Sequence, residues 1–160
     1  KMALSFIATT RGIPQIYAGT EIAMPSTEDH GELRKDFPGG WENDDINAFQ
    51  DIGLSTTQIE AKSFIKKLLN WRKSSKAVAH GKLIHYPVTR GVYVYLRVYQ
   101  QDKLMVLMNN KENEETINLD IYRESFSDKN IGIDILNGKK YNLSKELKIE
   151  PKTALILELK

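Results

Sequence analysis

The periodicity of the apolar residues changes near Gly81, and this change constrains the fold more than any other feature of the chain. Before Gly81, apolar residues recur at helical spacing or stand in short runs. After it, Val92, Val94, Leu96 and Val98 alternate with tyrosine and arginine, which is typical of a strand with one buried face. We therefore expect a helix-strand-loop-helix first half and an all-β second half.

The first half contains two predicted helices. Residues 2–11 carry apolar side chains with few breakers, and Arg11 followed by Gly12 suits a helix end. Thr57-Gln58-Ile59-Glu60 fits a capping box, so Thr57 is predicted to cap a helix over 58–75 while Glu60 reaches back. The apolar face of that helix carries Phe64, Ile65, Leu68 and Leu69.

Residues 13–18, with the sequence Ile-Pro-Gln-Ile-Tyr-Ala, are predicted to form a short strand between the helices. A loop over 20–56 follows it, and loops of this length are usually functional or disordered. A lone parallel strand cannot satisfy its own backbone, so it needs neighbours that this sequence does not contain. The sequence also begins inside a predicted helix, without a cap or a signal peptide, so we expect a piece of a longer protein.

The second half is predicted to be a small antiparallel β-sandwich, which makes the whole chain α+β. Asn137-Gly138 is a strong turn signal between two of its strands. The expected division is residues 1–76 and residues 77–160. Besides the alternating strand, short strands are expected around 83–86, 104–108, 115–119, 131–136 and 154–159.

The composition excludes several classes of function. Lysine and arginine number 23 against 21 aspartates and glutamates, so the formal net charge of +2 lacks the basic footprint of a nucleic-acid binder. Cysteine is absent, which excludes thiolate chemistry, and no apolar run is long enough for a membrane span. We expect no nucleic-acid partner, no membrane span and no cofactor, and the cellular compartment stays open.

The long loop carries the candidate binding residues. Arg34 can make planar hydrogen bonds to hydroxyls or carboxylates, or it can form an ion pair that holds the loop. Phe37 and Trp41 flank Pro38-Gly39-Gly40, and their rings can either offer flat faces to a sugar or plug the loop onto its own core.

The acids of this loop do not single out a catalytic pair. Hydrolysis of a glycosidic bond uses two carboxylates on opposite sides of the bond, but acids in a loop are more often simply solvated charges. Glu28-Asp29-His30 lacks a second imidazole at metal-binding spacing, so no metal site is expected. The loop acids are Glu21, Glu28, Asp29, Glu32, Asp36, Glu42, Asp44 and Asp45.

One face of the alternating strand carries Tyr93, Tyr95, Arg97 and Tyr99. Such a stripe can be a platform for carbohydrate or peptide. It can equally be the inter-domain or wet face of a sheet.

Residues 12–21, Gly-Ile-Pro-Gln-Ile-Tyr-Ala-Gly-Thr-Glu, closely resemble the last barrel strand of the α-amylase family, glycoside hydrolase family 13. Residues 29–41, Asp-His-Gly-Glu-Leu-Arg-Lys-Asp-Phe-Pro-Gly-Gly-Trp, resemble the cyclomaltodextrinase and neopullulanase branch. Residues 70–73, 93–97 and 134–138 are similar to that family's last barrel helix and C-terminal β domain.

The resemblance implies that residues 1–76 are the last helix-strand-helix portion of a (β/α)8 barrel, with residues 77–160 as the appended β-sandwich. The family's three catalytic carboxylates come from earlier strands, so no catalytic residue is assigned to this chain. Asp29 and Arg34 match a substrate-contact pair of the family. Phe37 and Trp41 would shape the same groove.

The resemblance also implies a function for the intact protein. It would cleave α-1,4-glucosidic bonds of maltodextrins, cyclodextrins or pullulan with retention, and this chain alone would be inactive. The alternatives are a non-catalytic carbohydrate-binding module or a structural cap built on the β half. Self-association is a further expectation, because residues 13–18 and the apolar side of the 58–75 helix must pack on something.

Overall fold

The computed structural model describes residues 1–26, 30–31, 34–126 and 129–160. These residues divide into two compact units, one of Lys1–Pro14 with Lys67–Lys160 and one of Gln15–Lys66. The α-helices are α1 (Met2–Thr9), α2 (Thr56–Ser74), α3 (Lys76–His80) and α4 (Arg123–Phe126), and two 3₁₀ turns are η1 (Thr20–Ile22) and η3 (Asp120–Tyr122). Helix α2 runs from the smaller unit into the larger one.

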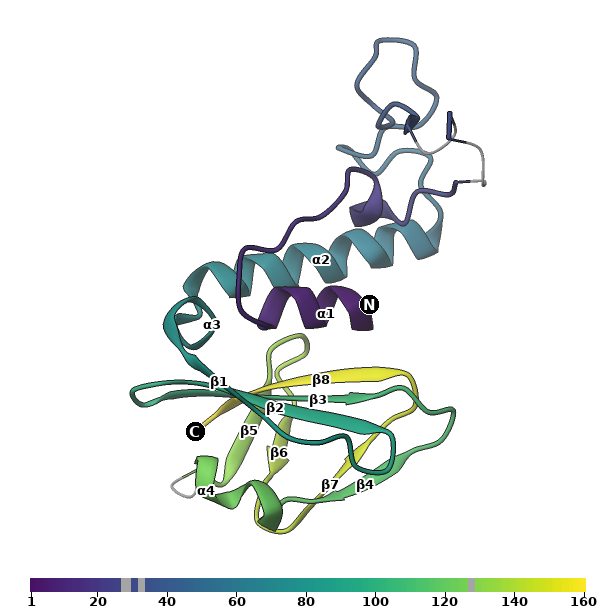
Figure 1. The fold of residues 1–160 in the computed structure, drawn as a ribbon. Helices are drawn as coiled ribbons and strands as arrows, with labels where there is room; N and C mark the ends of the chain where they lie inside the picture. The colour runs from purple at the N-terminus through teal and green to yellow at the C-terminus, as the bar shows by residue number, and fades with distance from the viewer. Residues whose placement is uncertain (27–29, 32–33, 127–128) are drawn as a thin grey trace. The chain divides into compact units, whose positions relative to one another are not determined.

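The larger unit is built on antiparallel strands (Figure 1). A six-stranded sheet has the order β1-β2-β3-β8-β5-β6, and β4 pairs with β7 in a second sheet. The bounds are β1 Lys82–His85, β2 Val92–Tyr99, β3 Asp102–Asn109, β4 Glu115–Asn118, β5 Ile131–Asp134, β6 Lys140–Asn142, β7 Glu146–Ile149 and β8 Thr153–Leu159.

One face of the large sheet packs against the β4–β7 pair and α4 to form the core. The alternation in β2 places Val94 and Leu96 in this core, while Tyr95 and Arg97 lie on the other face of the sheet. The core residues are Val92, Val94, Leu96, Met105, Leu107, Ile117, Leu119, Tyr122, Phe126, Leu143, Leu147, Ile149, Leu155, Leu157 and Leu159.

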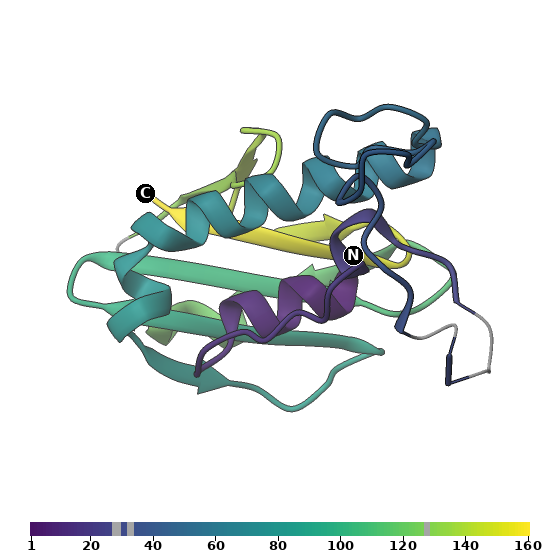
Figure 2. The same cartoon turned by 90° about the horizontal axis from the view of Figure 1, so that it is seen from above.

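Helices α1 and α3 lie over the second face of the large sheet (Figure 2). Phe6 of α1 packs on Tyr93 and Tyr95, with ring centroids 6.4 and 6.2 Å apart. The C-terminal part of α2 joins this layer, because Trp71 Nε1 donates to Glu158 Oε1 of β8 at 2.7 Å. The face with the tyrosines is therefore a packed layer within one unit.

The sequence predicted most of the second half correctly. All of the expected strands are present, with ends that differ by one or two residues, and Asn137-Gly138 lies in the turn between β5 and β6. Gly138 has φ +76°, a conformation that glycine adopts without strain. The small antiparallel sandwich is confirmed.

The predicted strand over 13–18 is wrong. Residues 13–17 have no regular secondary structure and pair with no strand among the described residues, and Ile13 is 96% exposed. An isolated strand has no partner for its N–H and C=O groups, so its propensity alone does not create a sheet. The assignment of residues 1–76 to a barrel stays a prediction.

The helix predicted over 58–75 is confirmed as α2, but the predicted cap at Thr57 is wrong. Ser55 Oγ accepts from the backbone N–H of Gln58 at 3.3 Å, and Gln58 Oε1 accepts from the backbone N–H of Ser55 at 3.0 Å. This reciprocal pair is a capping box that begins at Ser55, two residues before Thr57. The helix therefore begins at Thr56.

Candidate functional site

The candidate site is the loop that connects η1 to α2 in the smaller unit. Near its end, Asn47 and Ile52 exchange backbone hydrogen bonds of 2.9 and 3.0 Å. The Oδ1 atom of Asn47 accepts from the backbone N–H groups of Phe49 and Gln50 at 3.0 and 3.1 Å. Residues 47–52 are therefore a closed, hydrogen-bonded turn.

A second turn, at Gly39, packs against this one. Asp44 Oδ2 accepts from the backbone N–H groups of Gly39 and Trp41 at 2.7 and 3.1 Å, and Ala48 N–H donates to Pro38 O at 3.1 Å. Gly39 has φ +98°, and a Cβ there would lie 2.6 Å from Asn47 Oδ1. Only glycine fits this contact, so the Pro-Gly-Gly segment has a structural role in shaping the loop.

Lys62 of α2 anchors the same loop. Its Nζ donates to the carbonyl of Ala48 and to Asp51 Oδ1, both at 2.5 Å. Ala48 is buried. The turn is thus fixed to the helix within its own unit, which lowers the entropy lost when its side chains bind a ligand.

The predicted binding residues occupy different environments on this loop. Arg34 is exposed, Phe37 is half-buried and Trp41 is 68% exposed. Asp29 lies outside the described residues, so its position relative to Arg34 is not described. Trp41 does not plug the core, whereas Phe37 is partly enclosed.

Sequence reasoning missed Phe49 as a member of this surface. Its ring lies 5.3 Å from the Phe37 ring, centroid to centroid, and it is 69% exposed. Two large exposed aromatic side chains on one rigid loop are unusual for a solvated turn. The available signal was its place in the loop that carries Phe37 and Trp41.

The loop acids divide by role. Asp44 holds the backbone at Gly39, and Asp51 pairs with Lys62, so both have structural tasks. Glu21 differs from them, because its Oε2 atom is buried and has no hydrogen-bond partner among the described residues. Among the described residues, the geometry does not identify two of these acids as a catalytic pair.

Tyr95, at the centre of the tyrosine stripe of β2, is not available as a platform for carbohydrate or peptide. Tyr95 is fully buried, and its hydroxyl shares a 2.5 Å hydrogen bond with Thr9 Oγ1 of α1. Burial, opposed by the Thr9 hydrogen bond, raises the pKa of Tyr95 to about 12. The platform interpretation is therefore wrong for Tyr95, because α1 covers that face.

Arg97 helps to hold α1 and α3 over the tyrosine stripe. Its guanidinium donates to the carbonyls of Thr9, Val78 and Gly81 at 3.0, 2.7 and 2.9 Å. These carbonyls end α1 and α3, where the helix dipole favours a cation. Burial lowers the pKa of Arg97, with a smaller contribution from Arg72. Arg97 therefore joins both helices to the sheet.

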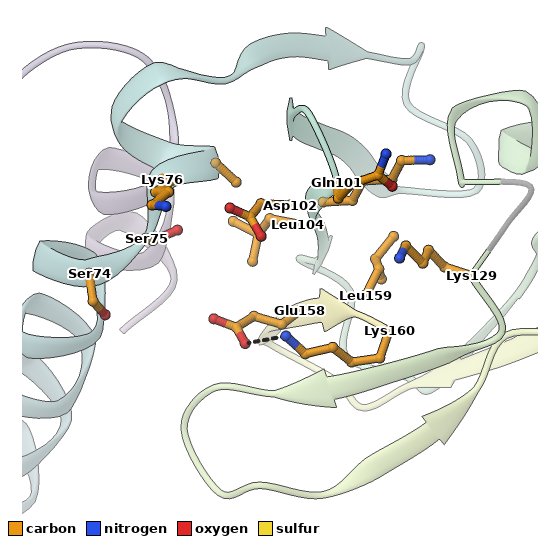
Figure 3. A pocket seen from close by; sticks show the side chains of 12 residues that line it. Ser74, Ser75, Lys76, Gln101, Asp102, Leu104, Lys129, Glu158, Leu159 and Lys160 are labelled. Carbon is orange, nitrogen blue, oxygen red and sulfur yellow. Dashed lines mark ion pairs between the residues drawn. The ribbon is translucent and has the colours of Figure 1, made fainter.

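A pocket of about 460 Å³ lies in the larger unit near the start of α3 (Figure 3). Lysines and two acids line it, and Glu158 is already engaged by Trp71 and by Lys160, whose Nζ is 3.5 Å from Glu158 Oε2. The remaining walls come from Ser74, Ser75, Lys76, Ala77, Gln101, Asp102, Lys103, Leu104, Lys129 and Leu159. Four lysines face two carboxylates here, and none of the predicted binding residues lines the pocket, so it is not the candidate site.

Across residues 1–26, 30–31, 34–126 and 129–160, no three His, Asp or Glu side chains form a group suited to a metal ion. None of the helices in those ranges is long and apolar enough to cross a membrane.

The larger unit matches a known protein family. Residues 83–158 match the family described as the cyclo-malto-dextrinase C-terminal domain. The chain is 31% identical over 109 residues to a cyclomaltodextrin glucanotransferase of Niallia circulans, and 32% identical over 113 residues to one of Bacillus sp. (strain 38-2). These matches cover 68% and 71% of this chain but 13% and 14% of the relatives.

Solved structures share the fold over nearly the whole chain. AmyP in complex with maltose has a TM-score of 0.74 at 18% identity, covering 98% of this chain and 33% of AmyP. The α-amylase of Geobacillus thermoleovorans complexed with acarbose has a TM-score of 0.74 at 22% identity, covering 99% of this chain and 32% of that protein. At such identities the likeness shows the fold alone. Residues 83–158 therefore belong to the family of cyclo-malto-dextrinase C-terminal domains, and the relatives support a C-terminal fragment of the α-amylase family, glycoside hydrolase family 13, of the cyclomaltodextrinase branch.

Proposed function

We propose that this chain is the C-terminal portion of an enzyme that hydrolyses α-1,4-glucosidic bonds in α-glucans such as maltodextrin, cyclodextrin or pullulan. The observation that carries the proposal is the match of residues 83–158 to a cyclomaltodextrinase domain. Relatives named cyclomaltodextrin glucanotransferase and α-amylase support the same substrate class. The chain spans 13–18% of the length of those relatives, so the catalytic part would lie elsewhere in the protein.

The proposed chemistry is retaining hydrolysis. One carboxylic acid protonates the glycosidic oxygen while a carboxylate attacks the anomeric carbon, which breaks the glycosidic bond and leaves a glycosyl ester on the enzyme. Water, deprotonated by the first residue, then releases the sugar with its original anomeric configuration. These carboxylates belong to the proposed remainder of the enzyme. Residues 1–76 would complete its barrel, with the loop over 20–56 at the substrate groove.

Arg34 and Asp29 are proposed to bind hydroxyls of bound glucose units, while Phe37 and Trp41 shape the groove. The exposure of Arg34 and Trp41 supports this role, because their side chains are available to a ligand. The rigid turn between Gly39 and Asn47 supports it further, since it fixes where Trp41 stands.

The first test is activity of the chain alone. Purified chain incubated with maltoheptaose or γ-cyclodextrin should release no glucose or maltose above a protein-free blank. Enzyme-dependent release would contradict the assignment of the catalytic carboxylates to another part of the protein. The reading frame upstream of this chain should encode a barrel with three catalytic carboxylates, and its absence there would refute the proposed function.

The second test concerns Arg34 in the enzyme that contains this chain. Arg34→Ala should raise KM for maltoheptaose roughly tenfold with little change in kcat, because it removes hydrogen bonds made equally in ground and transition states. Arg11→Ala is the matched control, since Arg11 is also exposed but lies outside the loop. Equal KM and kcat for the two variants would contradict a role of Arg34 in substrate binding.

Self-association is proposed through the exposed apolar residues of the 13–52 segment. Ile13, Tyr17, Trp41, Phe49 and Ile52 are all more than half exposed. The isolated chain should therefore form dimers or larger species by light scattering, and Ile13→Asp should reduce them. A monodisperse monomer at high concentration would contradict this proposal.

A further inference from the structure

The turn between β5 and β6 carries Asn137-Gly138, the one Asn-Gly pair in the sequence. Both residues are exposed. In such a pair the carboxamide carbon of the asparagine can approach the next backbone nitrogen, and glycine adds no Cβ to hinder it. Attack of Gly138 N on Asn137 Cγ expels ammonia, and this reaction is deamidation. Its rate depends on how the turn holds these two atoms.

The attacking nitrogen is held by a hydrogen bond. Gly138 N–H donates to the backbone carbonyl of Asp134 at 2.8 Å, and Gly138 has φ +76°. The nitrogen must lose its proton and turn toward Asn137 Cγ before it can attack, so this hydrogen bond has to break first. The closed turn therefore withholds the nucleophile.

The carboxamide of Asn137 is already polarised. Its Oδ1 atom accepts from Lys139 N–H at 2.8 Å. That donor stabilises the negative charge that develops on Oδ1 when a nitrogen adds to Cγ. The electrophile is thus prepared in the folded protein, and the hydrogen bond of Gly138 N–H is the barrier that remains.

Asp134 closes the turn through three of its atoms. Besides its carbonyl, its backbone N–H donates to Lys139 O at 2.9 Å. Asp134 is buried, and its Oδ1 atom accepts from Leu136 N–H at 2.9 Å. A few hydrogen bonds at the end of a hairpin break more often than the whole domain unfolds. Local opening of this turn is therefore the route by which Gly138 N becomes available.

We propose that Asn137 is a deamidation site whose rate is set by opening of the turn between Asp134 and Gly138. Once the turn opens, hydroxide from solvent takes the proton of Gly138 N, the bond from this nitrogen to Asn137 Cγ forms, and the Cγ–Nδ2 bond breaks. Water supplies the proton with which ammonia leaves, which regenerates hydroxide. A second water then opens the succinimide ring at either carbonyl and leaves aspartate or isoaspartate at position 137.

The isoaspartate product alters the hairpin. Its main chain is longer by the side-chain methylene, so Gly138 N–H no longer meets the carbonyl of Asp134 in the same geometry. Strand β6 is three residues long and lies at the edge of the six-stranded sheet, where it pairs with β5. The isoaspartate form should therefore lose the β5–β6 pairing, whereas the aspartate form keeps an Oδ1 acceptor for Lys139 N–H and should retain it.

The test compares deamidation with hydrogen exchange in the 160-residue chain. Deamidation is followed by mass spectrometry of the tryptic peptide 130–139, in which Asn130, followed by the β-branched Ile131, is an internal control. The folded chain should deamidate at Asn137 roughly tenfold or more slowly than the chain unfolded in urea. NMR should show Gly138 N–H protected from exchange by the same factor to within about threefold, because both reactions need the same hydrogen bond to open.

Variants at Asp134 change the opening of the turn without changing the Asn-Gly pair. Asp134→Ala removes the acceptor for Leu136 N–H and should speed both deamidation and Gly138 exchange about three- to tenfold in the folded chain. Asp134→Asn keeps an Oδ1 acceptor and should stay near the parent rates. Asn118→Ala is the matched control, because Asn118 Oδ1 accepts from Asp120 N–H at 2.9 Å in another turn. It should leave both rates unchanged.

Equal deamidation of the folded and the unfolded chain would overturn the proposal, as would a folded Asp134→Ala variant that reacts at the parent rate. If Asp134→Ala does not fold, the parent chain is measured in urea below its unfolding transition. Rates of deamidation and Gly138 exchange that rise together there support opening of the turn, whereas rates that change only with global unfolding overturn it. A β5–β6 pairing that survives in the purified isoaspartate form would overturn the consequence drawn for the hairpin.

Discussion

Replacing Arg97 by methionine should destabilise the larger unit by about 3 kcal/mol. Its guanidinium is 2% exposed and donates to the carbonyls of Thr9, Val78 and Gly81 at 2.7–3.0 Å. Hydrogen bonds from a charged donor contribute roughly 1.5 kcal/mol or more each, and methionine leaves all three carbonyls buried without a donor. The Nε atom of Arg97 is buried and has no hydrogen-bond partner in the part of the chain that the structure describes, so the substitution also relieves a penalty of about 1–2 kcal/mol.

The assay is urea unfolding followed by far-UV circular dichroism, together with the thermal midpoint. A loss of about 3 kcal/mol corresponds to a Tm lower by roughly 6–12 °C for a domain of this size. Arg97→Lys should lose nearly as much, because one ammonium cannot reach the ends of both α1 and α3. Arg11→Met, at an exposed position, is the control and should change stability by less than about 0.5 kcal/mol.

Hydrogen exchange tells whether the loss is local. If Arg97 holds the helices, amides of α1 should lose protection in Arg97→Met before those of β3 and β8. A variant within about 0.5 kcal/mol of the parent chain, with α1 protection intact, would refute the role assigned to Arg97.

Three further predictions concern single residues. Stability should fall by about 1.4 kcal/mol per pH unit between pH 10 and pH 12, because Tyr95 keeps its proton in the folded state up to about 12; Tyr95→Phe should flatten this fall in urea titrations, and an unchanged slope would contradict it. Ser55→Ala should cost about 1 kcal/mol of unfolding free energy and Thr57→Ala much less, and the reverse order would place the cap at Thr57. Gly39→Ala should disturb the Asn47 turn, because Gly39 has φ +98° and an added Cβ would lie 2.6 Å from Asn47 Oδ1; unchanged amide shifts at 47–52 would contradict this prediction.

The sequence predicted those parts of the fold whose signal is local. The alternation of apolar and polar residues from Val92 to Val98 is enough to predict β2, because a period of two between two turns is typical only of a strand. Glu146-Leu147-Lys148-Ile149 carries the same alternation over only four residues and was missed as β7, although Leu147 and Ile149 are both buried. Strand β6 is three residues long and carries no readable period.

Other parts depend on partners that are distant in the sequence. The stripe with Tyr95 and Arg97 is visible in the sequence, but the covering α1 is more than 80 residues away, so the pattern cannot tell a platform from a packed face. Two overlapping segments matched a capping box, and only the hydrogen bonds of Ser55 and Gln58 distinguish them. On the candidate loop, Phe37 and Trp41 were found from their residue types, whereas Phe49 required the ring contact.

The polypeptide leaves the larger unit at Pro14 and returns to it at Lys67, so the segment that carries the candidate site is an insertion in that unit. Arg97, Tyr95 and Trp71 fasten the two flanks of the insertion to one sheet. Doubling the length of such an inserted loop costs only about 0.6 kcal/mol of closure entropy. The sequence of this insertion can therefore be exchanged, lengthened or nicked while α1 stays bound, and an α1 peptide added in trans should complement a chain that lacks it.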